Sequence, residues 1–295
     1  LIDLGDHDRA AAALVRLQQA MITAGTRPRR RIASGERFAP QIAAQAPMLP
    51  IARILLATAY GYACRFDEAE RELGRALALP AAAGSETHRG YADVARAFYV
   101  EQWTRGPAQA LGSLDAAIAR LERADPSDPL SFRLFARILR SYVMLELGRH
   151  AEVLEQVDVL RAEFGRRGAA KVLMRSARWV RSTALAGLGR WDELAAEFEP
   201  PPRAPDPAFA TSYSYRYRAP AALLAGHRRD AAGTEAQIAA AREEMAAFGR
   251  AFDDHWFLCD FAVAAAAAGR AQLARRQARD ALAAVEPLGS TWAAA

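Results

Sequence analysis

A short pattern recurs along the chain: a small residue, usually Gly, then a polar or aromatic pair, then the start of an amphipathic helix. Copies occupy 4–10, 63–69, 147–153, 188–194, 225–231 and 268–274, and a weaker copy with a displaced Gly occupies 104–110. Apart from one gap of 59 residues near the N-terminus, successive copies are separated by about forty residues, which indicates an internal repeat.

The pattern is typical of two helices joined by a tight turn. Gly adopts the left-handed conformation after a last helical turn, and Asp or Glu suits the first turn of the next helix because of the helix dipole. We predict a helix from Asp8 to about Thr23, followed by helical hairpins. The expected hairpins span about 51–79, 88–124, 130–164, 168–199, 207–248 and 252–286. A lone hairpin cannot bury its apolar face, so the units are expected to stack into a superhelix.

Composition supports an all-α fold. Alanine, the best helix former, accounts for 71 of the 295 residues, and β-branched residues are scarce. No uncharged apolar run is long enough for a membrane span, and the N-terminus lacks the pattern of a secretory signal. We therefore expect a cytoplasmic chain without a membrane segment.

Proline-rich stretches set the expected domain limits. Residues 1–23 are an incomplete first repeat, 24–50 a Pro- and Arg-rich loop or short helix, and 51–286 the hairpins. Residues 199–207 are a possible hinge or a stiff excursion over the surface. Residues 287–295 are the start of a truncated further repeat, and we expect the chain to be a piece of a longer polypeptide.

The hairpins resemble tetratricopeptide repeats. The segment from Arg53 carries that family's consensus residues at the family's spacing, namely Leu56, Ala57, Tyr60, Ala69, Leu73 and Ala76; a second segment fits nearly as well with Phe261, Ala262, Gly269, Ala274 and Ala281. Arg140 and Arg181 depart from the consensus, because they stand where the family has a Leu. The resemblance implies an α-solenoid of about six to seven antiparallel helical hairpins in a right-handed superhelix.

The long, degenerate repeats also resemble those of the large LuxR-type ATP-binding regulators related to the maltose-operon activator. That resemblance implies a signal-responsive bacterial transcriptional activator in which a nucleotide-binding domain precedes the repeats and a helix-turn-helix follows. ATP is then expected only in a neighbouring domain, with no cofactor in this segment. A homo-oligomer is possible for the full-length protein.

The net charge of +5 rests almost entirely on Arg and is mild for the chain's length, so no direct DNA contact is expected from this segment. The dense cluster Arg27, Arg29, Arg30, Arg31 and Arg37 favours a solvated loop over a phosphate-binding arm. Cys64 and Cys259 are far apart in the sequence, and neither has a second Cys nearby. We interpret both as small core residues of a reduced protein.

No catalytic constellation is found. The only Lys, Lys171, lacks the glycines of a phosphate-binding loop, and neither GxSxG nor HExxH occurs. Asp253 and Asp254 are interpreted as capping and dipole-complementing residues at a helix start. We therefore expect a protein that is not an enzyme and has no metal site.

A binding surface remains. The tetratricopeptide register places large side chains of the first helices on the concave face, where a peptide or protein partner or a small-molecule effector could bind. These side chains are Tyr62, Tyr99, Trp103, Tyr142, Trp179, Tyr213 and Trp256, with Arg216 among them. The alternative is that the rings form the core between hairpins.

Two arginine ridges compete with this aromatic groove. Arg133, Arg137 and Arg140 share one helical face, and Arg175, Arg178 and Arg181 share another; Arg137 and Arg178 are included among the candidate groove residues. The ridges could attract a carboxylate or phosphate. The favoured alternative is a solvated outer face paired with Glu and Asp of neighbouring helices.

Two functions follow from these expectations. The first is a non-catalytic domain for regulatory ligand sensing and protein–protein interaction within a transcriptional activator. The alternative is a constitutive scaffold that docks a peptide or helix, such as one attached to a caspase-like protease or another effector.

Overall fold

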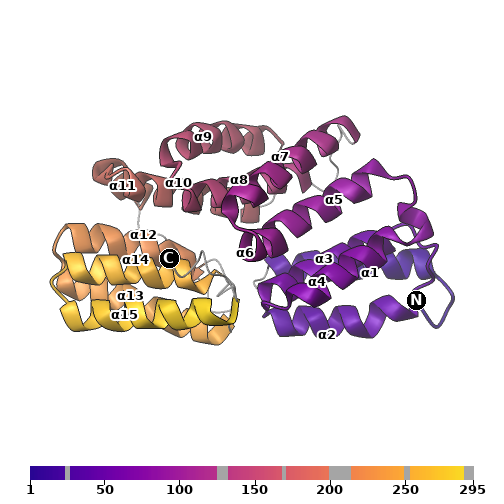
Figure 1. Cartoon of the computed structure of the whole chain (residues 1–295), viewed down its shortest axis with the longest axis horizontal. Coiled ribbons are helices and arrows are strands. Elements are labelled where there is room, and N and C mark those ends of the chain that lie inside the picture. The colour runs from indigo at the N-terminus through magenta and orange to yellow at the C-terminus, as the bar shows by residue number, and fades with distance from the viewer. Residues whose placement is uncertain (24–26, 125–131, 168–170, 199–213, 249–252, 289–295) are drawn as a thin grey trace. The chain divides into compact units, whose positions relative to one another are not determined.

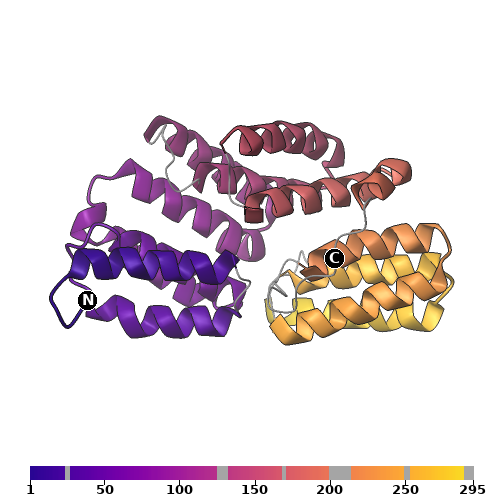
Figure 2. The ribbon, with the colours of Figure 1, turned by 180° about the vertical axis from the view of Figure 1, so that it is seen from behind.

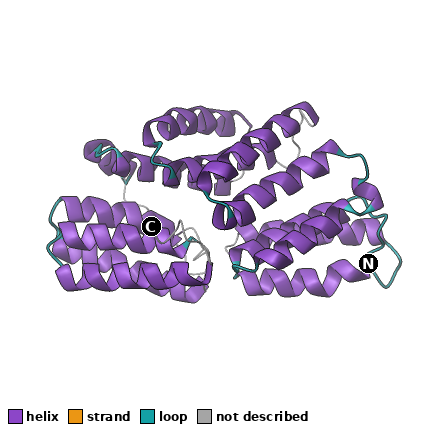
Figure 3. Ribbon diagram, viewed as in Figure 1, coloured by secondary structure: helices purple, strands orange, loops and turns teal. Residues whose placement is uncertain are grey.

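The computed structural model describes residues 1–23, 27–124, 132–167, 171–198, 214–248 and 253–288. Within these ranges the chain is helical and contains no strand, as predicted (Figure 3). None of the helices described there has the length and apolar character needed to cross a membrane. The chain divides into two compact units, Leu1–Val143 and Met144–Ala295.

The first unit contains α1 to α7 and most of α8, and its helices pack against their neighbours in sequence. The bounds are α1 (His7–Thr23), α2 (Pro28–Phe38), α3 (Leu49–Tyr62), α4 (Phe66–Leu77), α5 (Glu86–Arg96), α6 (Gln102–Thr104), α7 (Pro107–Ala124) and α8 (Phe132–Glu146). Helices α1, α2 and α4 contact α3, and α5 contacts α3, α4 and α7 (Figures 1 and 2). A five-residue π-helix, η3 (Ala97–Glu101), joins α5 to α6.

The second unit contains the end of α8 and helices α9 to α15. Their bounds are α9 (His150–Arg167), α10 (Lys171–Gly187), α11 (Trp191–Glu197), α12 (Ser214–His227), α13 (Ala231–Phe248), α14 (Asp254–Ala267) and α15 (Ala271–Val285). Helix α10 contacts α9, α11 and α12, while α12 to α15 lie side by side (Figure 1). The proposed hinge at 199–207 and residues 289–295 lie outside the described residues, and 286–288 form a short 3-10 helix.

The turn that begins the second helix of each predicted pair has a characteristic conformation. One residue in each turn has a positive φ: Gly5, Cys64, Gly106, Gly148, Gly189, Arg229 and Gly269, with φ between 57° and 96°. In most of these turns the next N–H donates to the carbonyl five residues earlier, as in Arg149 to Met144 (3.0 Å) and Arg190 to Leu185 (3.0 Å). This is the Schellman geometry of a helix end. We call the positive-φ residue the turn residue.

One predicted turn glycine has a different role. Gly226 is not the turn residue of its copy, because α12 continues to His227 and Arg229 takes the left-handed conformation. A Cβ on Gly226 would lie 2.5 Å from the carbonyl oxygen of Ala264, so Gly226 allows α12 and α14 to approach closely. A glycine at a helix contact and a glycine at a helix end give the same sequence signal.

The Arg-rich stretch forms α2, the short helix that was one of the two structures expected for residues 24–50; Pro28 occupies its first turn, where a missing N–H costs nothing. The expectation of a fully solvated arginine cluster is wrong at one position. Arg31 is buried there and donates to the Thr58 hydroxyl oxygen (2.8 Å). Nor are the cysteines core residues, since Cys64 is half-buried at its turn and Cys259 is exposed on α14.

Candidate functional site

Most candidate aromatic side chains of the first unit lie in its core. Tyr99, Trp103 and Tyr142 are buried, and Tyr62 is half-buried. The Tyr62 and Tyr99 ring centroids are 5.1 Å apart, and the Trp103 indole donates to the carbonyl oxygen of Phe98 (3.2 Å). The structure brings Tyr62 and Tyr99 together, but these rings fill space between helices rather than line an open groove.

In the second unit, Trp179 and Arg216 meet around a buried ion pair. The Arg216 guanidinium pairs with the Asp253 carboxylate, and its central carbon lies 5.8 Å from both the Trp179 and Phe257 ring centroids. Both members of the pair are almost fully buried. Burial raises the pKa of the Asp253 carboxyl, and the positive charge of Arg216 opposes that shift.

Asp253 occupies the N-cap position of α14 and Asp254 lies in its first turn, as the sequence predicts, but the Asp253 side chain accepts no capping hydrogen bond there. Its carboxylate is instead used by Arg216, thirty-seven residues earlier in the chain. Sequence reasoning grouped Asp253 with its neighbours and had no signal for this distant partner.

The remaining candidate aromatic residues are Trp256 and Tyr213. Trp256 is half-buried, and its indole nitrogen donates to the Glu146 carboxylate (2.5 Å). This bond ties the first turn of α14 to the last residue of α8. Tyr213 lies outside the described residues.

Four of the six ridge arginines, Arg137, Arg140, Arg178 and Arg181, pair with carboxylates of neighbouring helices. In the first unit, Arg137 pairs with Glu122, and Arg140 donates to Asp115 (2.5 Å), so both link α8 to α7. In the second unit, Arg181 of α10 reaches Asp158 of α9 (3.1 Å). Both candidate groove arginines thus take part in ion pairs, Arg137 with Glu122 and Arg178 with Glu197 (3.5 Å).

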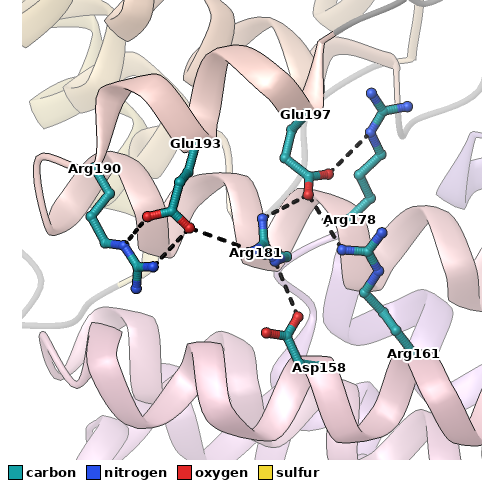
Figure 4. Close-up of polar contacts among 7 residues, drawn as sticks. All are labelled: Asp158, Arg161, Arg178, Arg181, Arg190, Glu193 and Glu197. Carbon is teal, nitrogen blue, oxygen red and sulfur yellow. Dashed lines mark hydrogen bonds and ion pairs between the residues drawn. The ribbon is translucent and has the colours of Figure 1, made fainter.

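The densest ion-pair network joins α9, α10 and α11, and we take it as the candidate functional site (Figure 4). Three guanidinium groups converge on Glu197, at 2.7 Å from Arg181, 3.3 Å from Arg161 and 3.5 Å from Arg178. Glu197 is 12% exposed, whereas Arg161 and Arg178 are about a third exposed. The network is thus anchored on a largely covered carboxylate and bounded by more accessible cations.

A second carboxylate, Glu193, lies at the other side of the network. It is held by Arg190, whose Nε donates over 2.5 Å, and it approaches Arg181 at 4.0 Å. Figure 4 shows Glu193 and Arg190 on one side of Arg181, with Arg161 and Arg178 on the other. The network therefore has a charge-balanced side and a side that is rich in guanidinium groups.

Part of this network recurs at fixed distances from the turn residues. In several repeats an arginine stands eleven residues before the turn residue: Arg53, Arg137, Arg178 and Arg218. In several repeats a Glu or Gln stands eight residues after it: Glu72, Gln156, Glu197, Gln237 and Gln277. Three of these pairs are in contact: Arg53–Glu72 (2.8 Å), Arg178–Glu197 (3.5 Å) and Arg218–Gln237 (3.2 Å). The Arg178–Glu197 contact is therefore one instance of a pair that links the two helices of a hairpin.

The sequence contained a signal for this pair that was overlooked. A helical-face pattern relates only arginines of the same helix, so it does not identify Arg161 or Glu197, which lie on α9 and α11. Aligning the chain on its turns places Arg and Glu or Gln at equivalent positions in several hairpins. Arg161 does not stand at either of these repeated positions. It belongs to α9, in the preceding hairpin, and approaches Glu197 only when the helices pack together.

No protein-family model, curated protein or solved structure matches this chain. Among the residues that the structure describes, no group of three or more His, Cys, Asp or Glu side chains is placed to hold a metal ion.

Proposed function

We propose that this chain is a non-catalytic helical-repeat domain that recognises a peptide or protein partner, with its hairpins stacked in a right-handed, tetratricopeptide-like α-solenoid. The observation that carries the proposal is the recurrence of both the turn residue and the Arg–Glu or Arg–Gln pair in the same register. Repeats that share a register bury equivalent surfaces on one another and leave an extended surface for binding.

The arginine network supplies the binding chemistry. Interfaces between proteins are enriched in Arg, because its planar guanidinium group makes several directed hydrogen bonds. In the network of α9 to α11, Arg161 and Arg178 are accessible while Glu197 and Arg181 hold them in place. A partner would therefore meet donors that are already positioned.

Partner binding could serve either of two roles, which we propose as alternatives. In the first, the domain belongs to a cytoplasmic LuxR-type regulator, and the bound ligand biases a neighbouring ATP-binding domain. In the second, the domain is a constitutive docking scaffold. A ligand can regulate only if it binds two states of the domain differently.

A thermal-shift screen of the chain with sugars, nucleotides and short peptides tests the proposal, since a ligand of the folded state raises the melting temperature by mass action. We expect at least one peptide to give a concentration-dependent rise. If sugars or nucleotides do so and no peptide does, the partner-binding proposal is wrong.

Hydrogen exchange separates the two versions. With a peptide bound, protection confined to the binding surface supports the scaffold, whereas changed protection in helices that do not contact the peptide supports a regulatory domain.

A further inference from the structure

We propose that an acidic segment of a partner protein docks on the guanidinium-rich side of the α9–α11 network, at Arg161, Arg175 and Arg178. This inference rests on the proposed partner-binding function and names its site and the chemistry of its partner.

The charges on this side of the network do not balance. Arg161, Arg178 and Arg181 share the single carboxylate of Glu197; Arg181 also contacts Asp158 and, at 4.0 Å, the Glu193 carboxylate that Arg190 already holds. With Arg190 included, four guanidinium groups meet three carboxylates, so one positive charge is left over.

Arg175 adds a further positive charge to the same helix face. It is exposed and lies one turn before Arg178 on α10. Its backbone carbonyl oxygen accepts a hydrogen bond from the Tyr217 hydroxyl, which links this turn of α10 to α12. No ion pair holds the Arg175 guanidinium within the described residues.

Comparing equivalent positions of the hairpins shows which arginines of the network take part in repeated pairs and which do not. Arg178 and Glu197 are equivalent to Arg53 and Glu72, and Arg181 is equivalent to Arg140, which also bonds an Asp of the preceding helix. These pairs hold hairpins together. Arg161 has no equivalent in this repeated pattern, so Glu197 contacts one guanidinium group more than the pattern accounts for.

The internal contacts of Arg161 and Arg178 leave donors available. Arg178 reaches Glu197 only through Nε, and Arg161 only through one terminal nitrogen, at distances longer than that of Arg181. Figure 4 shows the terminal nitrogens of Arg178 pointing away from Glu197. Two adjacent guanidinium edges suit carboxylates, which they can bind in a bidentate manner.

The surrounding charges favour an acidic protein segment over nucleic acid. Asp158 and Glu193 are exposed beside the network, at 57% and 45%, and would repel a continuous phosphate backbone. Nucleic-acid sites present an extended stripe of positive charge, whereas the whole chain carries only +5. A peptide can place its carboxylates at the arginines and neutral side chains at the acidic positions.

A binding experiment with the whole chain tests the inference. The probe is a short fluorescein-labelled peptide of alternating Glu and Gly, and the matched control peptide has Gln in place of Glu. We expect the Glu peptide to bind with an affinity that falls as salt is added, and the Gln peptide to bind at least about fivefold more weakly.

Two variants locate the site. The double variant Arg161→Gln/Arg178→Gln should weaken binding of the Glu peptide by at least about fivefold, because it removes the exposed donors. Arg181 still pairs with Glu197 in this variant, so no buried carboxylate loses its last partner. The control Arg89→Gln removes an equally basic, exposed side chain of α5 that pairs with Glu86 and lies outside the network, and it should change affinity less than about twofold.

Equal affinity of the double variant and the unmodified chain, with unchanged helicity, would show that the peptide does not bind at Arg161 and Arg178. Tighter binding of a single-stranded oligonucleotide, lost in the same variant, would overturn the acidic partner. If the Glu peptide does not bind but another peptide raises the melting temperature, the acidic-segment proposal is wrong and the partner-binding function stands. If no peptide binds, both are wrong.

Discussion

Arg216 and Asp253 form an ion pair that is buried almost completely between α12 and the residue preceding α14. The guanidinium group also lies against the rings of Trp179 and Phe257. Removing water from both charges is costly, and their attraction offsets that cost only while both are present. The pair therefore makes the packing of α10, α12 and α14 depend on two single residues.

Replacing Asp253 with Asn should destabilise the fold strongly. The substitution leaves the Arg216 charge buried without a counter-ion, and the expected loss in the free energy of unfolding is about 3–5 kcal/mol. Urea denaturation of the whole chain measures it. The double variant Arg216→Met/Asp253→Leu should recover most of the loss, because it removes both buried charges. An Asp253→Asn variant as stable as the unmodified chain would show that the pair contributes little.

Asp260 should make the fold less stable at alkaline pH. Burial raises the pKa of its carboxyl from 3.8 to about 7. Between these values the folded chain holds a proton that the unfolded chain has released, so stability from this group is complete at low pH and is lost as pH rises toward 7. Asp260→Asn should therefore stabilise the chain at about pH 8, by up to about 4 kcal/mol, and hardly at about pH 4.

Urea denaturation of both proteins across this pH range provides the measurement for Asp260. The informative quantity is the difference between them, since other groups titrate equally in both. A difference that stays constant with pH would contradict the raised pKa.

The helices and their turns could be predicted because their signals are local. A Gly such as Gly148 in the left-handed conformation, followed by an amphipathic helix, is written in a few adjacent residues. Arg229 escaped the prediction because its conformation is imposed by the length of α12 and not by its own preference.

The candidate site was less predictable because it depends on packing between helices. The spacing of Arg178 and Arg181 placed them on one helix face, but nothing near them in sequence identified Glu197 as their shared partner. Likewise Trp103 and Trp179 have the same pattern whether they line a groove or fill a core. Both are buried because neighbouring helices pack over them, which the local sequence does not indicate.

Gly226 should not tolerate a methyl group. An added Cβ would meet the backbone oxygen of Ala264 at 2.5 Å, so α12 and α14 would have to separate, at a cost of roughly 1–3 kcal/mol. Gly112 is a matched control, because it is exposed within α7 and has open space around its Cα. There Ala should stabilise the helix by about 0.5–1 kcal/mol. Thermal denaturation followed by circular dichroism compares the two; equal effects would show that the close approach is unimportant.

The two turns without glycine should be improved by glycine. Cys64 and Arg229 have φ of 59° and 57°, a region in which a Cβ is strained by roughly 1 kcal/mol or more. Cys64→Gly and Arg229→Gly should each raise the melting temperature, while the reciprocal Gly148→Ala should lower it. The greater flexibility that Gly gives the unfolded chain offsets part of the gain. A fall in melting temperature in both Gly variants would mean that side-chain contacts of Cys64 and Arg229 outweigh the relief of backbone strain.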